Sequence, residues 1–402
     1  MEPKIRFKGF EGEWKTSTIG DFTTSFSGGT PTAGASEFYG GNIPFIRSGE
    51  IHESKTELFL TEAGLNNSSA KVVEKGTLLY ALYGATSGEV GISKIKGAIN
   101  QAILAIYPNK TVDKRFLANY LQSHKQKIVG ELLQGGQGNL SGALVKSISV
   151  TYPNNREQQT ISDYVDSLDS QISASTSRLA SLKQMKAASL QAMFPQEGET
   201  VPKIRFKGFE GEWKKVKLNS FAKRVTRKNS HLESTLALTI ASAHGLVSQI
   251  DYFNNLVVGS NIRNYYLLKK GEFAYNKSYS NGYPFGSVKR LERYEQGILS
   301  TLYITFSIDN SISSDYLTHF FDTNLWHKEV AERAAEGARN HGLLNIGAND
   351  FLDINIWKPE SKAEQQAIAS YFTSLDRQIS LQSQRLEKLK QIKSACLDKM
   401  FV

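Results

Sequence analysis

The side chains best suited to chemistry in the first half of the chain lie in polar loops that follow strand-like runs. Arg47 ends the run 42–46, and an arginine that bonds guanine through two nitrogens is the commonest specific contact in a DNA major groove. Amide side chains pair similarly with adenine, and the glycine-rich stretch 134–139 offers both amide types. We therefore predict base contacts from Arg47, Ser48, Tyr83, Thr86, Ser87, Gln137 and Asn139. For any single residue, a solvated loop that contacts nothing is an equally open interpretation.

Loops of similar character recur in the second half. Residues 276–281 combine a lysine, a tyrosine and two asparagines, and residues 339–341 read Arg-Asn-His. Glycine-rich turns at 28–31 and 84–88 could present backbone N–H groups to a phosphate, although most such turns only reverse the chain. In this half we predict base contacts from Lys277, Tyr279, Asn281, Arg339, Asn340 and His341.

Catalytic motifs are missing. The chain has no Gly-Lys dipeptide, which the phosphate loop of an NTPase requires, and no HExxH zinc motif. No two prolines are adjacent, so the Asn-Pro-Pro-aromatic loop of amino-methyltransferases cannot be present. The seven histidines show no spacing typical of metal ligands. We expect neither a catalytic residue nor a metal site in this chain.

Composition favours an anionic partner. The 402 residues include 48 Lys and Arg against 39 Asp and Glu, and the resulting charge of +9 suits nucleic acid without requiring it. The single cysteine, Cys396, cannot form an internal disulfide. The charged N-terminus and the lack of a long apolar run predict neither a signal peptide nor a membrane span, and hence a cytoplasmic protein.

The chain contains an internal duplication. The twelve residues Pro3–Trp14, PKIRFKGFEGEW, recur unchanged at Pro202–Trp213, and Glu157–Phe194 returns in similar form at Glu364–Phe401. Neither copy of the longer stretch contains Gly or Pro, which is typical of a continuous helix. We therefore predict a mixed α/β domain over 1–153, a spacer helix over 154–194, a linker over 195–201, a second α/β domain over 202–360 and a second spacer helix over 361–402.

The apolar residues of the two helices recur with heptad spacing, as at a helix–helix seam. Ser175 and Gln382 interrupt the two rows at matching places and could fix the register. Each helix is about 57 Å long at ~1.5 Å per residue. A chain that leaves along one helix and returns along the other forms an antiparallel coiled coil. The alternative is that each helix is buried in a separate core. The predicted seam residues are Ile161, Val165, Leu168, Ile172, Leu179, Leu182, Ile368, Phe372, Leu375, Ile379, Leu386 and Leu389.

The two variable regions, 15–155 and 214–360, share a common frame. Short runs rich in β-branched and aromatic residues read as strands at 76–80, 102–106 and 148–153, and again at 271–275, 302–306 and 354–359. Helices are predicted at 116–133 and 316–335. The fold class predicted is α+β, with two mixed α/β domains separated by two long helices in an antiparallel coiled coil and a pseudo-two-fold internal repeat.

The chain resembles the DNA-specificity subunits of Type I restriction-modification enzymes. The resemblance rests on Ser27–Pro31, on Glu37–Ile51, on the Glu-Gln-Gln openings at Glu157 and Glu364, and on the duplicated helix. The second variable region departs from the pattern, because Lys223–Lys228 stands where the first has Ser-Gly-Gly-Thr-Pro.

This resemblance implies that the α/β domains are target-recognition domains, each reading one half of a split, asymmetric site in double-stranded DNA. The helices would set the half-site spacing and dock two methyltransferase subunits, and restriction-translocase subunits would join them. S-adenosylmethionine, ATP and Mg would then act in the partners, with no cofactor on this chain. Two alternatives remain: a methyltransferase or nuclease with unrecognised motifs, and a coiled-coil scaffold that reads no bases.

Overall fold

The computed structural model describes residues 2–133, 139–241, 245–255, 261–280, 282–334 and 344–402. The chain divides into two compact units: unit 1 comprises residues 1–177 and 384–402, and unit 2 comprises residues 178–383. Each unit therefore contains one end of each long helix. None of the described helices is long and apolar enough to cross a membrane.

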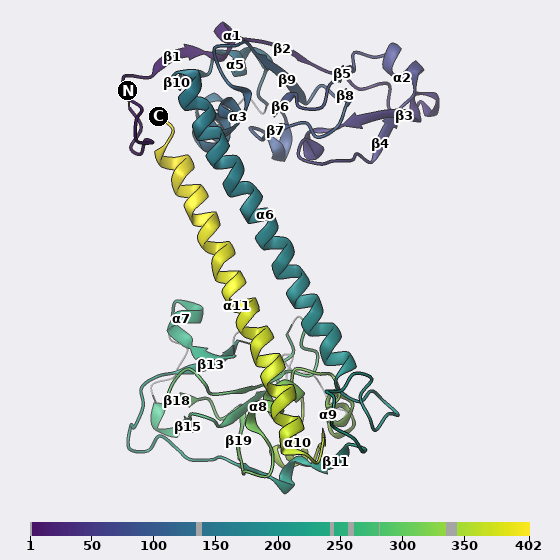
Figure 1. Cartoon of the computed structure of the whole chain (residues 1–402), viewed down its shortest axis with the longest axis vertical. Helices are drawn as coiled ribbons and strands as arrows, with labels where there is room; N and C mark the ends of the chain where they lie inside the picture. The colour runs from purple at the N-terminus through teal and green to yellow at the C-terminus, as the bar shows by residue number, and fades with distance from the viewer. Residues whose placement is uncertain (1, 134–138, 242–244, 256–260, 281, 335–343) are drawn as a thin grey trace. The chain divides into compact units, whose positions relative to one another are not determined.

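Unit 1 is built on two four-stranded sheets and one pair of strands (Figure 1). The first sheet has the order β2-β9-β6-β7 and is antiparallel, whereas the second, β4-β3-β8-β5, contains one parallel pair, β3 with β8. The strands are β1 (Lys15–Thr18), β2 (Thr23–Ser27), β3 (Tyr39–Ile46), β4 (Leu58–Leu60), β5 (Lys71–Val73), β6 (Leu78–Ala81), β7 (Val90–Ile92), β8 (Gly97–Ile99), β9 (Ile103–Pro108) and β10 (Ser149–Tyr152), where β1 pairs with β10. The helices are α1 (Ile19–Phe22), α2 (Glu62–Asn66), α3 (Lys114–Ser123), α4 (Lys125–Leu132) and α5 (Gly142–Ser147), with 3-10 turns η1 (Ser36–Phe38), η2 (Ser48–Glu50) and η3 (Gly84–Thr86).

The central strand β6 is buried on both faces. Because strand side chains alternate, Leu78 and Tyr80 pack into one hydrophobic cluster and Leu79 and Ala81 into another. The first cluster also contains Phe116 of α3. Burial on both faces explains why β6 reads as a continuous apolar run rather than as an alternating pattern.

Unit 2 repeats this frame. Its four-stranded sheet has the order β12-β19-β16-β17. Three separate two-stranded sheets, β11-β20, β13-β14 and β15-β18, complete the unit. The strands are β11 (Lys214–Lys217), β12 (Ala222–Arg224), β13 (Leu238–Ala241), β14 (Gly245–Ser248), β15 (Tyr266–Lys269), β16 (Phe273–Asn276), β17 (Ser287–Arg290), β18 (Gln296–Leu299), β19 (Ile304–Ile308) and β20 (Asn355–Lys358). The helices are α7 (Gln249–Phe253), α8 (Ser314–Phe320), α9 (His327–Arg333) and α10 (Ala348–Leu352), with 3-10 turns η4 (Leu218–Ser220) and η5 (Ile262–Asn264).

The predicted strands are present in both units, but the helices predicted at 116–133 and 316–335 are each broken in two. The first break falls at His124, whose ring stacks on Tyr120 with centroids 4.3 Å apart. The second break contains Trp326, which is buried and donates from its indole N–H to the carbonyl of Phe321 at 3.2 Å. Trp326 also packs against Tyr275 of β16, so at the second break a tertiary contact overrides the local helical pattern.

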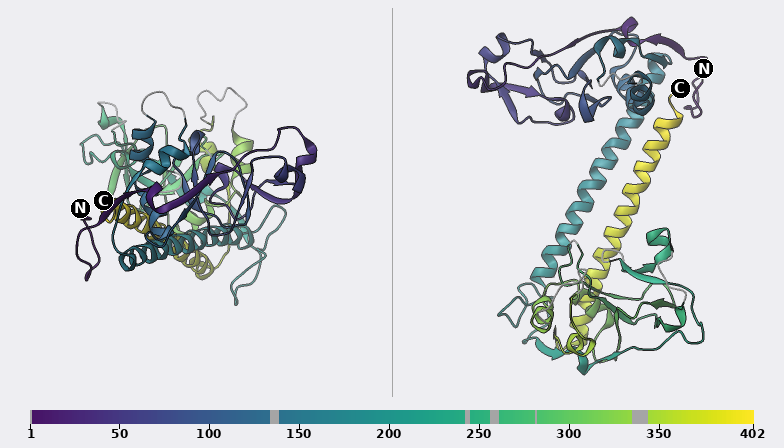
Figure 2. Two further views of the ribbon diagram at one scale, coloured as in Figure 1. Left: turned by 90° about the horizontal axis from the view of Figure 1, so that it is seen from above. Right: turned by 180° about the vertical axis from the view of Figure 1, so that it is seen from behind.

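The two long helices are α6 (Asn155–Ala192) and α11 (Lys362–Lys399), each of 38 residues, as predicted. In unit 1 the start of α6 and the end of α11 lie side by side in both views (Figure 1; Figure 2). Of the predicted seam residues, Ile172, Leu179, Ile379 and Leu386 are only partly buried. The predicted polar positions Ser175 and Gln382 are both buried. The other predicted seam residues are buried, and of these Ile161 packs into a hydrophobic cluster of unit 1 and Ile368, Phe372 and Leu375 into one of unit 2. The buried set is Ile161, Val165, Leu168, Leu182, Ile368, Phe372, Leu375 and Leu389.

The repeated twelve-residue segment explains how the helices meet in unit 1. Arg6 donates to both carboxylate oxygens of Glu157 at 2.7 and 2.8 Å, near the start of α6. The adjacent backbone N–H of Ile5 donates to the carbonyl of Lys399, the last residue of α11. One short segment thus ties the beginning of one helix to the end of the other.

The second copy of the segment makes the same contacts in unit 2. Arg205 donates to both carboxylate oxygens of Glu364 at 2.7 Å, and Ile204 donates from its backbone to the carbonyl of Ala192. Both glutamate side chains are only 1% exposed. Letter-for-letter identity of the segments is expected where each must satisfy a buried carboxylate.

Lysines at polar seam positions form ion pairs across the helices. In unit 1, Lys393 lies 2.5 Å from Asp169. In unit 2, Lys186 lies 2.7 Å from Asp376 and 2.9 Å from Asp322, which also pairs with Lys289 at 2.9 Å. Lys186 and Lys393 occupy equivalent positions of the two helices, and each forms an ion pair with the opposite helix. The lysines that interrupt the apolar rows therefore have a structural role.

The charges of this cluster stabilise unit 2 over a wide pH range. Burial would raise the pKa of Asp322, but the Lys289 and Lys186 ammonium groups and the neighbouring His319 ring hold it well below its usual range. Burial would lower the pKa of Lys186, but Asp322 and Asp376 raise it. By linkage, the aspartate contribution is lost as pH falls through its depressed pKa, and the lysine contribution is lost as pH rises through its raised pKa.

We expect Lys186→Met to destabilise unit 2 by about 2 kcal/mol, because the largely buried Asp322 carboxylate then keeps only Lys289 of its two lysine partners. The matched variant Lys393→Met should cost less than about 1 kcal/mol, because Asp169 is half exposed and can be solvated. The free energy of unfolding of both variants is measured from the hydrogen exchange of amides in α11 at increasing urea concentration. Equal losses in the two variants would contradict the difference in burial.

Candidate nucleic-acid interface

The structure brings the predicted loops of unit 1 together at one end of the central strands. The backbone N–H of Leu140, beside Asn139, donates to the carbonyl of Leu82, beside Tyr83, at 3.0 Å. A Cβ at Gly91 would lie 2.9 Å from the carbonyl oxygen of Ile51, so glycine there lets the turn after Arg47 approach β7. Gln137 lies outside the described residues.

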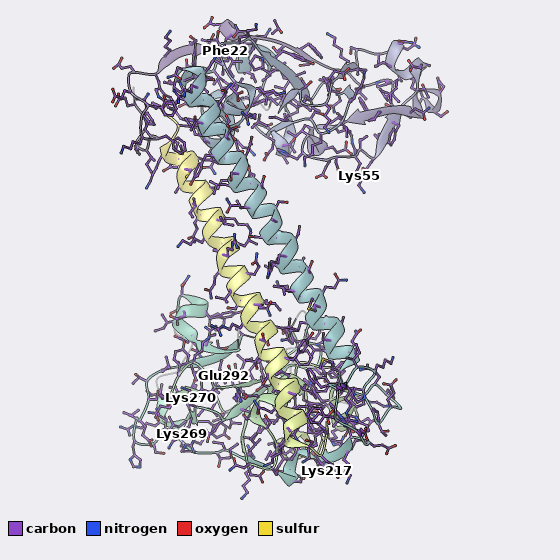
Figure 3. The ribbon with its side chains drawn as sticks, viewed as in Figure 1. Phe22, Lys55, Lys217, Lys269, Lys270 and Glu292 are labelled. Atoms are coloured by element: carbon purple, nitrogen blue, oxygen red, sulfur yellow. The ribbon has the colours of Figure 1, made fainter. Side chains whose placement is uncertain are left out.

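Arg47 is held by two carboxylates. Its Nε and Nη2 donate to Glu50 at 3.1 and 3.0 Å, and Nη2 also donates to Glu57 at 2.6 Å. The intervening Lys55 projects from the rim of unit 1 (Figure 3). Arg47 is 40% exposed, so part of its guanidinium faces solvent. Arg47 could contact a base either while it keeps both carboxylate contacts or after the base replaces one of them.

Glu50 forms the fixed part of this arrangement. Its carboxylate also accepts from the backbone N–H groups of Arg47 and Glu57 at 3.0 and 3.1 Å. The hydroxyl of Thr56 lies 3.1 Å away. Burial alone would raise the pKa of Glu50, but the hydrogen bonds from Arg47 and the two backbone N–H groups lower it to about 2. Glu50 therefore stays ionised and orients the guanidinium of Arg47.

The loop after β6 presents a ring rather than hydroxyl groups. The Thr86 hydroxyl donates to the carbonyl of Tyr83, and the Ser87 hydroxyl donates to that of Leu82, both at 3.2 Å. Tyr83 is 36% exposed. Ser48 is half-buried and Asn139 is exposed. Tyr83, Arg47 and Asn139 thus offer exposed surface, whereas Thr86 and Ser87 also shape the loop.

The glycine-rich turns are explained by packing. A Cβ at Gly28 would lie 1.8 Å from the carbonyl oxygen of Ile99, and the N–H of Gly29 donates to the same carbonyl. The N–H groups of Ser87 and Gly88 donate to backbone carbonyls within their own loop and strand. Because the N–H groups of Gly29, Ser87 and Gly88 are already bonded, these three donors are not available to a phosphate.

One ion-pair chain beside these loops was not anticipated from the sequence. Glu89 lies 2.5 Å from Lys125 of α4 and 3.5 Å from the ring of His52. The Lys125 hydrogen bond lowers the pKa of Glu89 from its usual value. Glu50 follows Arg47 at the three-residue spacing of a local ion pair, which is a readable signal. Glu57, His52, Glu89 and Lys125 are far apart in sequence and carry no local signal.

Unit 2 shows a comparable meeting of loops. The N–H of Leu344 donates to the carbonyl of Lys277 at 2.9 Å, and the Lys277 ammonium lies 3.4 Å from the carbonyl of Ile346. Tyr279 is 62% exposed. The predicted contacts Asn281, Arg339, Asn340 and His341 lie outside the described residues. The described ends of the two loops are nevertheless joined, as in unit 1.

Two other polar features lie apart from these loops. A cleft of about 620 Å³ contains Lys75, Lys110 and Lys114, but it sits where β9 ends and α6 begins, at the opposite end of the central strands. Among the described residues, His319, Asp322 and Asp376 form the one group of metal-type ligands. Lys186 and Lys289 already neutralise its carboxylates, so the group fits an ionic contact between elements better than a cation site.

The sequence comparisons agree with this arrangement. Residues 11–184 match the family described as the Type I restriction modification DNA specificity domain. The chain is 31% identical over 170 residues to the Type I restriction enzyme MjaIX specificity subunit of Methanocaldococcus jannaschii, covering 39% of this chain and 38% of the relative. It is 24% identical over 174 residues to the EcoR124I/EcoR124II specificity subunit of Escherichia coli, covering 41% of this chain and 43% of the relative. The matches therefore span less than half of these curated relatives.

Two solved structures share the fold. The crystal structure of a Type-I restriction-modification system S subunit from M. genitalium has a TM-score of 0.66 at 14% identity, covering 100% of this chain and 99% of that chain. A structure concerning complex assembly and conformational transition of the type I R-M system has a TM-score of 0.52 at 14% identity, covering 97% and 98%. At this identity the likeness concerns the fold alone, which is a duplicated α/β unit joined to two long helices. Residues 11–184, which are less than half of the 402 residues, are therefore similar to the Type I restriction modification DNA specificity domain.

The pKa of Glu50 tests the arrangement around Arg47. In a carbon-13 carboxyl titration we expect a midpoint near 2, so its contribution to stability is present above about pH 4.3 and is lost as pH falls toward 2. In Arg47→Ala the pKa should rise clearly, because burial remains and the largest lowering contact is gone. Glu57→Gln is the control and should leave Glu50 near 2. An unchanged pKa in Arg47→Ala would contradict the proposed orienting contact.

Proposed function

We propose that this chain is the non-catalytic DNA-reading subunit of a Type I restriction-modification complex, with each unit reading one half of a bipartite, asymmetric site. The observation that carries the proposal is one frame built twice with different loop chemistry. The strand orders β2-β9-β6-β7 and β12-β19-β16-β17 correspond, whereas the exposed loops carry Arg47 and Tyr83 in one unit and Tyr279 in the other. A common frame with divergent loops suits two related but different ligands.

The long helices are proposed to act as a spacer. An antiparallel coiled coil with a pseudo-two-fold axis is supported by the apolar seam residues and by the ion pairs of Lys186 and Lys393. The repeated ion pairs of Arg6 with Glu157 and of Arg205 with Glu364 support it as well. Helix length then sets the distance between half-sites, about one to one and a half DNA turns. The remaining exposed faces are proposed to dock two methyltransferase subunits.

The proposed complex also contains restriction-translocase subunits. The curated relatives are named as specificity subunits, which supports placing catalysis elsewhere. S-adenosylmethionine, ATP and Mg would then be bound by the partners. The competing proposals, a methyltransferase with unrecognised motifs and a scaffold without base readout, predict cofactor binding by the isolated chain and methylation without sequence preference, respectively.

Exchange of residues 15–155 for the equivalent region of a relative is expected to change one half of the recognised site. The exchanged segment lies between Arg6 and Glu157, so the ion pair of these two residues is kept and the change is confined to unit 1. Methylation mapping of DNA from cells carrying the chain with its methyltransferase partner is the readout. The matched exchange of residues 214–360 should change the other half. A change in both halves, or in neither, after either exchange would contradict the modular function.

Arg47→Ala is expected to cost ~1–3 kcal/mol of binding free energy and to relax preference at one base pair, if Arg47 bonds guanine through two nitrogens. Arg47→Lys should lose the same preference, because lysine keeps the charge but not the planar fork. Competition binding against duplexes with single base-pair replacements measures both. An equal loss on every duplex would assign Arg47 to the phosphate backbone instead.

A further inference from the structure

The guanidinium of Arg47 has two hydrogen-bonding edges, and the neighbouring glutamates occupy different ones. Glu50 accepts from Nε and Nη2, which fills the side edge with a bidentate pair. Glu57 accepts from Nη2 at the end edge, which Nη2 shares with Nη1. Within the described part of the chain, no residue bonds to Nη1. A single carboxylate therefore closes the end edge of Arg47.

The two glutamates differ in how firmly they are held. The side chain of Glu50 is 12% exposed and accepts from several donors, whereas that of Glu57 is 80% exposed. Among the described residues, Arg47 is the one donor to the Glu57 carboxylate. The backbone N–H of Glu57 is bonded to Glu50, so its side chain can swing away without moving the chain. Exposed ion pairs of this kind are weak and are readily exchanged.

We infer that Glu57 is a specificity-determining residue that competes with DNA for the end edge of Arg47. This inference rests on the proposed function. Guanine presents two acceptors, O6 and N7, in the major groove, and these match Nη1 and Nη2 of the end edge. Adenine and thymine each present one acceptor beside a donor or a methyl group. Guanine therefore replaces the Glu57 contact fully, whereas another base replaces it poorly.

The inference predicts a gain in affinity for the guanine-bearing duplex in Glu57→Gln. Binding to guanine then no longer costs the Glu57 contact, whereas a duplex on which Arg47 would have kept that contact gains less. Discrimination against a replaced guanine should rise about two- to fivefold, the range of an exposed ion pair. Discrimination at the other base pairs of the site should stay the same.

Glu53→Gln supplies the matched control. Glu53 lies in the same turn, is exposed, and its backbone N–H donates to the carbonyl of Glu50, but no described residue bonds to its side chain. Glu53→Gln removes the same charge near the same surface as Glu57→Gln. Any general effect of charge on DNA phosphates should therefore appear equally in Glu53→Gln and Glu57→Gln.

The test uses the full chain assembled with its methyltransferase partner. Competition binding is measured on duplexes that carry the target mapped in cells and on duplexes with each base pair replaced in turn. The variants are Glu57→Gln, Glu53→Gln, Arg47→Ala and the double variant Arg47→Ala with Glu57→Gln. Thermal unfolding of each variant checks that the turn is preserved.

The expected result is a gain of discrimination at one base pair in Glu57→Gln alone, with no further effect of that substitution in the Arg47→Ala background. A uniform gain in affinity that Glu53→Gln shares would overturn the inference, as would the same gain of discrimination in the Arg47→Ala background. If the unmodified complex prefers its target and Glu57→Gln is unchanged, the inference alone fails. If the unmodified complex shows no preference, the proposed function fails, and the inference fails with it.

Discussion

The buried ion pair between an arginine of the repeated segment and a glutamate at the start of a long helix is the constraint on which the rest of the structure depends. Each carboxylate is almost fully buried, and an unpaired charge there would be strongly destabilising. In unit 1, Arg6 also donates to the carbonyls of Glu11 and Gly12, so the same side chain shapes the loop of its own segment. The neighbouring residue, Ile5, bonds the end of α11. One segment thus fixes a helix start, a helix end and the entry to the variable region.

This constraint confines variation to a region with a fixed entry and exit. β1 begins directly after the repeated segment and pairs with β10, which ends just before α6, so Lys15 lies opposite Tyr152. A buried glutamine extends the constraint into the unit: Gln158 accepts from the N–H of Asp113, the residue that caps α3. Gln365 accepts in the same way from Ser313, which caps α8. The loops between can differ without disturbing the helices.

The frame was readable from the sequence because its signals are local or repeated. Duplicated letters and a run free of Gly and Pro identified α6 and α11, and apolar runs identified the central strands β6 and β16. The break near Trp326 was not readable, because Trp326 packs against Tyr275 from a distant strand. The break at His124 involves a ring contact with Tyr120, only four residues earlier, and was missed. The candidate site was readable only in part. Arg47 was singled out by residue type and stays a prediction, and its contact with Glu57 is made through a turn that local pattern does not encode.

Two kinds of polar contact therefore have different roles in this fold. Buried contacts, such as those of Glu157 and Glu50, fix geometry because each has several donors and little access to water. Exposed contacts, such as that of Glu57, can be exchanged at small cost. On Arg47 the two kinds meet on one guanidinium: the carboxylate of Glu50 orients its plane, and the exposed carboxylate of Glu57 contacts Nη2 at the other edge. A change in the exposed partner can then alter what Arg47 contacts, while the orientation of its guanidinium and the frame behind it stay the same.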